Sequence, residues 1–159
     1  MIDQEIVEAF KEEVQQLVRE MIPIVEKLEA IDPDSEFPSA LMERFAHIAD
    51  GIMGTSKTLL ESDSTQSGLQ MLSGIAALCK ATGYKAAQSR CALLVPIFSA
   101  FWTDTVEVIE ELVETINDTE KAKKIGVSLA PTLRKRLEWL AKKVKELAQE
   151  SHDDSLSQI

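Results

Sequence analysis

Apolar residues recur along the chain at spacings of three and four, in segments separated by polar or proline-rich stretches. In residues 2–30 these spacings predict a helix with one buried stripe. The same period returns in four further segments, at about 39–60, 65–81, 85–116 and from 128 or 131 onward. No stretch alternates apolar and polar residues as a half-buried strand does. We therefore predict an all-α fold, an antiparallel four-helix bundle with an additional helix, about five helices in all.

Prolines and glycines mark the points where these helices are expected to bend or end. Pro23 falls inside the first helix and is expected to kink it, because proline removes a backbone donor. Thr82-Gly83 is expected to end the third helix, with the glycine in a left-handed conformation. Pro96 is expected either to kink the fourth helix or to mark its start. We assign residues 1–150 to a single domain and residues 151–159, which carry no apolar stripe, to a disordered C-terminal tail.

The composition is that of a globular protein and argues against several functions. The 159 residues are 45% hydrophobic with a net charge of −10, which makes nucleic acid an unfavourable partner. Cys79 and Cys91 are too few for a disulfide scaffold, and with two histidines they do not form a zinc site. The acidic start differs from a signal peptide, and the apolar stretch at 91–98 is too short to span a membrane. We expect a cytoplasmic protein with no metal and no cofactor.

Charge is distributed unevenly along the chain. Residues 1–118 contain 8 basic and 21 acidic side chains, whereas residues 119–150 contain 9 basic and 4 acidic ones. The simplest explanation is a basic last helix that packs beside acidic helices. The alternative is that the last helix forms a docking surface for an acidic partner.

The second predicted helix contains two glycines, Gly51 and Gly54, although each costs about 1 kcal/mol relative to alanine inside a helix. Helical spacing places a set of polar and small residues on the face opposite the apolar stripe. These residues are His47, Asp50, Gly54, Lys57 and Glu61. Two interpretations follow: the glycines allow another helix to pack closely, or they allow the backbone of another protein to approach Asp50. The chain contains no phosphate-binding glycine loop and no nucleophile signature.

At residues 50–56 the sequence resembles a histidine-phosphotransfer (Hpt) domain, particularly the N-terminal phosphotransfer domain of chemotaxis histidine kinases. That family carries His-x-apolar-Lys-Gly, followed by small residues, in the second helix of a four- or five-helix bundle. Ile52, Gly54 and the two small residues after it match this pattern. Asp50 stands where the phospho-accepting His belongs, and Met53 stands where the Lys belongs. The helix order and the acidic first helix extend the resemblance over most of the chain.

The resemblance implies a non-catalytic pseudo-Hpt protein in two-component phosphorelay signalling. A carboxylate at Asp50 is a weaker nucleophile than an imidazole, and Met53 offers no positive charge, so phosphotransfer is expected to be lost. The expected partner is the receiver domain of a response regulator or of a hybrid histidine kinase, bound without transfer of phosphate. The residues expected to contact it are His47, Asp50, Gly51, Met53, Gly54 and Lys57.

Two other functions remain open at this point. His47 lies one helical turn before Asp50 and would be the phospho-accepting residue if the protein were an active phosphorelay intermediate. The chain would otherwise be a helical adaptor or a self-associating bundle unrelated to phosphorelays. An apolar patch away from Asp50, near Trp102 or Trp139, would favour that last function. The sequence does not fix the oligomeric state.

Overall fold

The structure, a computed structural model, describes residues 3–128 and 130–157 and is helical throughout apart from short connections. No strand occurs among these residues, so the predicted all-α class is confirmed. Six α-helices and one 3-10 turn follow in order. They are α1 (Gln4–Glu29), α2 (Ser39–Ser62), α3 (Ser67–Ser89), η1 (Ala92–Leu94), α4 (Val95–Glu114), α5 (Thr119–Ser128) and α6 (Ala130–Ser157).

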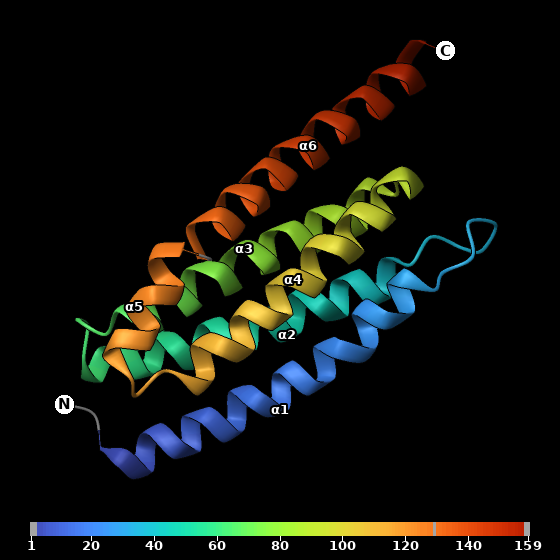
Figure 1. The fold of residues 1–159 in the computed structure, drawn as a ribbon. Helices are drawn as coiled ribbons and strands as arrows, with labels where there is room; N and C mark the ends of the chain where they lie inside the picture. Colours follow the sequence, from blue (N-terminus) through green and yellow to red (C-terminus); the bar gives the residue numbers. More distant parts are fainter. Residues whose placement is uncertain (1–2, 129, 158–159) are drawn as a thin grey trace.

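Helices α1 to α4 form the bundle, with α1 against α2 and α4, and α3 against α2 and α4 (Figure 1). Helix α6 lies along α3 on the outside of the bundle, and the short α5 packs at one end against α3 and α6. The predicted bundle with additional helical structure is thus confirmed. The described residues contain six α-helices rather than about five, because residues 119–128, which lie between two predicted helical segments, form α5.

The apolar stripes predicted from the sequence form one core between the helices. Trp102 of α4 is completely buried at its centre. The Trp102 ring stacks on Phe45 of α2 at a centroid distance of 4.0 Å and on Phe98 at 5.2 Å. Its indole Nε1 has no hydrogen-bond partner among the described residues. Trp102 is therefore a core residue and not a surface anchor.

Gly83 does not end the third helix as predicted, since α3 continues through it to Ser89. The reason is packing: a Cβ on Gly83 would lie 2.8 Å from the Ala46 Cβ and 3.2 Å from the Met42 carbonyl oxygen of α2. The missing side chain at Gly83 is what allows α2 and α3 to approach each other closely. The left-handed residue is instead Arg90, with φ of 51°, directly after the end of α3.

The long helix predicted at 85–116 is two helices. Residues 85–89 belong to α3, and α4 begins at Val95 with Pro96 in its first turn. Pro96 therefore marks a helix start, one of the two predicted alternatives, because a first-turn proline loses no helical hydrogen bond. Pro23 lies inside α1, which is continuous across it.

The C-terminal segment also differs from the prediction. Helix α6 continues to Ser157, through most of the tail predicted at 151–159, because no glycine or proline follows Pro131 to stop it. Residues 158–159 lie outside the described residues.

One stretch of the described residues, Ala92–Glu114, is long and apolar enough to cross a membrane by length and composition alone. Half of this stretch is buried inside the bundle, where Trp102 and its neighbours form the core. Its apolar character is thus explained by its position in the core.

Candidate functional site

The polar face of α2 points outward, as predicted. His47, Gly51, Gly54 and Lys57 are exposed, and Asp50 is half-buried. On the opposite side of the helix the apolar stripe is buried, with Phe45 and Ile52 completely so. We call His47, Asp50, Gly51, Gly54 and Lys57 the α2 surface. Helix α2 itself packs against α1 and α3 (Figure 1).

The two glycines of the α2 surface have different surroundings. A Cβ on Gly54 would have no atom within 4 Å, whereas a Cβ on Gly51 would lie 3.5 Å from Cδ1 of Leu17 in α1. Gly54 therefore does not serve close packing between helices of this chain. That role belongs to Gly83, and Gly54 leaves an open, flat place on the surface one turn beyond Asp50.

Asp50 is paired with a residue that the sequence analysis did not single out. The Lys80 Nζ of α3 donates to Asp50 Oδ1 at 2.9 Å, and the two side chains are 38% and 42% exposed. The hydrogen bond and the negative charge of Asp50 raise the pKa of the Lys80 ammonium above its ordinary value. The carboxylate at this surface is thus accompanied by a cation from the neighbouring helix. Only the close α2–α3 packing brings the two residues together, so helical spacing within α2 gave no signal for Lys80.

The residues next to Gly54 are less available than the sequence suggested. Ser56 is completely buried and donates to the Ile52 carbonyl oxygen at 2.7 Å. Thr55 donates to Glu13 Oε1 of α1 at 3.3 Å. Met53 is half-buried and packs against the core, so at most its outer atoms face a partner. Of the small pair that matched the Hpt pattern, Ser56 serves the fold and does not line the surface.

His47 is exposed, and its side chain makes no hydrogen bond or ion pair within the part of the chain that the structure describes. It lies one turn before Asp50 on the same broad face. No group of three or more His, Cys, Asp or Glu side chains that could hold a metal ion occurs in the described residues. His47 is the one imidazole of the α2 surface.

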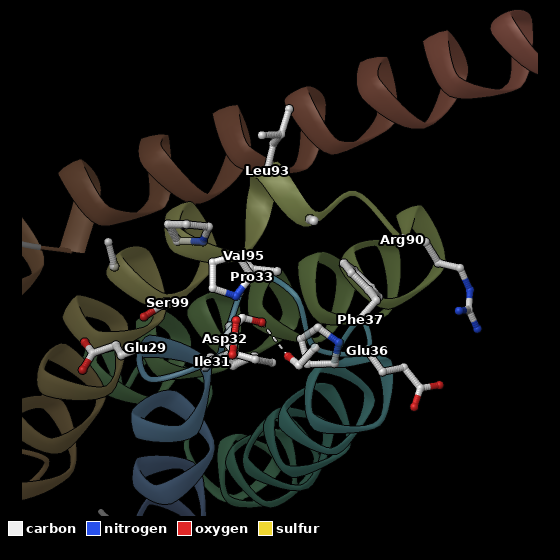
Figure 2. Close-up of a pocket in the computed structure, with 16 residues that line it drawn as sticks. Glu29, Ile31, Asp32, Pro33, Glu36, Phe37, Arg90, Leu93, Val95 and Ser99 are labelled. Carbon is white, nitrogen blue, oxygen red and sulfur yellow. Dashed lines mark hydrogen bonds between the residues drawn. The ribbon is translucent and has the colours of Figure 1, made fainter.

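A separate pocket lies at the end of the bundle where α1 leads into α2 (Figure 2). Its volume is about 560 Å³, and its walls come from the connection at 30–38 and from the junction between α3 and α4. Phe37, Pro33 and Val95 gather around it, while Arg90 and Glu36 point away at its edge (Figure 2). None of the residues of the α2 surface lines this pocket.

The two cysteines are free thiols. Cys79 is completely buried in α3, and burial raises the pKa of its thiol to about 12. Cys91 is half-buried in the connection before α4.

No protein-family model, no curated protein and no solved structure matches this chain. The resemblance to Hpt domains thus depends on the residues quoted from the sequence and on the order of the helices.

Proposed function

We propose that this protein is a non-catalytic Hpt-like signalling module that binds the receiver domain of a response regulator or hybrid kinase without carrying phosphate. The observation that supports the proposal best is the open position at Gly54, one turn beyond Asp50 on the outward face of α2. An exposed helical glycine costs about 1 kcal/mol relative to alanine and gains nothing from packing inside this chain. Access for a partner explains why it is there.

The charges of the α2 surface suit a partner that carries an acidic site. Lys57 and His47 are exposed, and Lys80 balances the carboxylate of Asp50. The surface is therefore less negative than the net charge of −10 suggests. A receiver domain of the family that Hpt proteins bind presents a cluster of acidic residues, and local positive charge reduces the repulsion towards it.

The same residues argue against transfer of phosphate through Asp50. A carboxylate is a weak nucleophile, and the Asp50 oxygen is further occupied by the Lys80 ammonium at 2.9 Å. Met53 has no charge with which to stabilise a transferring phosphoryl group, and it is half-buried. A module of this kind acts by binding to the receiver, which it sequesters, scaffolds or inhibits.

The experiment is a binding and transfer assay with purified receiver domains, beginning with those encoded beside the gene. The proposal expects at least one receiver to bind with a measurable Kd, and no label to reach this chain from that receiver in its phosphorylated form. If no receiver binds, the proposal is wrong. If label does reach the chain, the claim that it carries no phosphate is wrong.

An active phosphotransfer protein is the second candidate, and the exposure of His47 is the observation that favours it. In that case label from the receiver appears as an acid-labile phosphoramidate and disappears in His47→Ala. Asp50→Ala, changed one turn away on the same face, serves as the matched variant and retains the label only if His47 is the acceptor.

A further inference from the structure

Helix α6 presents an aromatic side chain to solvent beside a cleft. Trp139 is 50% exposed, and its ring meets Phe101 of α4 edge-on at a centroid distance of 6.2 Å. The two rings help to line an open cleft of about 460 Å³ between α4 and α6. The other lining residues are Thr132, Lys135 and Arg136. The cleft is apolar at its base, with cations at its edge.

Further cations continue the same face of the helix. Lys142 and Lys143 follow Trp139 by three and four residues, which places them one turn beyond it on the same side. Lys135 and Arg136 precede Trp139 by four and three residues, one turn before it. We call Phe101, Lys135, Arg136, Trp139, Lys142 and Lys143 the α6 surface.

Three acidic side chains lie near these four cations: Asp104, Glu138 and the exposed Glu146, one turn beyond Lys142 and Lys143. Arg136 pairs with Asp104 of α4 at 3.7 Å, but both side chains are more than half exposed, so the pair is weak. Glu138 is paired with Arg134 on the neighbouring side of α6. The α6 surface therefore keeps a positive charge on a protein whose first 118 residues are strongly acidic.

We infer that the α6 surface binds an acidic segment of a partner protein that carries one large apolar side chain. The apolar side chain would enter the cleft that Phe101 and Trp139 line, and flanking carboxylates would meet the cations on either side. Charge complementarity favours an acidic partner at the α6 surface, since residues 1–118 are strongly acidic and repel it. A half-exposed tryptophan beside arginine is also a typical centre for such an interface.

A membrane fits these observations less well than a protein segment. Only one large apolar side chain, Trp139, is exposed on the α6 surface, and one anchor gives marginal membrane binding. The cleft is also concave, which suits an inserted side chain better than a flat lipid surface. The α6 surface is built from α4 and α6, whereas the α2 surface is built on α2 beside α1 and α3, so this inference is independent of the proposed receiver binding.

The test measures binding of the full chain to a short, fluorescently labelled synthetic peptide by fluorescence anisotropy. The peptide has one central Phe flanked on both sides by Glu. Two companion peptides replace the Phe by Ala, or every Glu by Gln. The inference expects the first peptide to bind and each companion to bind at least about tenfold more weakly. It expects Trp139→Ala to lower the affinity for the first peptide by at least about tenfold. The double variant Lys135→Gln with Lys142→Gln is expected to lower it by the same amount.

Lys27→Gln removes one exposed cation from α1, outside both named surfaces, and is the matched control, with affinity expected to stay within about twofold. A thermal melt of each variant separates lost binding from lost fold. The inference is overturned if the peptide fails to bind at millimolar concentration, or if Lys27→Gln weakens its binding as much as the α6 variants do. It is also overturned if Trp139 is instead required for binding to phosphatidylserine vesicles or for self-association in sedimentation.

Discussion

The ion pair between Asp50 and Lys80 decides the electrostatic character of the candidate site. Because Asp50 raises the pKa of Lys80, the folded state holds that proton more tightly than the unfolded chain does. The stabilisation is therefore present below the ordinary lysine pKa of 10.5 and is lost as the pH rises through the raised value. In Asp50→Asn, we expect the Lys80 pKa measured by NMR to fall towards 10.5. An unchanged Lys80 pKa would contradict the pairing.

The two cysteines should react at very different rates. With a pKa of about 12, the buried Cys79 thiol is almost entirely protonated at pH 8 and is also inaccessible. Iodoacetamide on the native protein is expected to modify Cys91, which is half-buried in a connection, and to leave Cys79 unmodified until denaturant is added. Mass spectrometry of peptides after timed quenching measures both. Equal native rates for the two thiols would show that the core around Cys79 opens readily.

At the scale of the helices, two glycines that look alike in the sequence have opposite roles. Gly54→Ala adds a Cβ in open space and should stabilise the fold by up to about 1 kcal/mol through helix propensity. Gly83→Ala places its Cβ against Ala46 of α2 and should destabilise the fold by about 1–3 kcal/mol. Urea unfolding of the two variants beside the wild type measures both changes. A stabilised Gly83→Ala would mean that α2 and α3 are not closely packed.

The same comparison shows which elements could be predicted from the sequence. The apolar period was sufficient for the fold class and for most of the buried stripes of α1, α2 and α4, since that period follows directly from helical geometry. Ile6, which the same period places on the stripe of α1, is 52% exposed. The ends of α3 were not predictable in this way. Gly83 carries a stop signal by composition, but it is held in the helix by a neighbour 37 positions earlier in the sequence. Packing between α2 and α3 therefore outweighs the local tendency of Gly83 to end a helix.

The candidate site, like the fold, could be predicted from the sequence only in part. Periodicity alone placed His47, Asp50, Gly54 and Lys57 on the outward face, because the opposite stripe had to be buried. It could not find Lys80, which reaches Asp50 only across the α2–α3 interface. Ser56 matched the Hpt pattern as a small residue, but a sequence pattern cannot tell an exposed small residue from a buried one, and Ser56 is completely buried.

At the scale of the whole molecule, the two surfaces described above lie on different helices and differ in charge. The α2 surface combines an ion pair with an open glycine, and the α6 surface combines cations with an aromatic cleft. Both surfaces are expected to bind partners, and the two affinities should depend differently on salt concentration. Raising the ionic strength should strongly weaken binding of the acidic peptide to the α6 surface, because this binding depends on charges at the protein surface, which salt screens.

The central claim is that the α2 surface binds a receiver domain, and Gly54→Arg tests it most directly. The new side chain projects from an open position, so stability should be unchanged or improved, while affinity for the receiver should fall well over tenfold, about 1.4 kcal/mol or more. Val127→Arg adds the same charge at an exposed position of α5 and should leave the affinity unchanged. Titration of one receiver with the wild type and both variants, beside their thermal melts, gives the comparison. Equal affinity for Gly54→Arg and the wild type would contradict the account, because it would place the receiver on another surface.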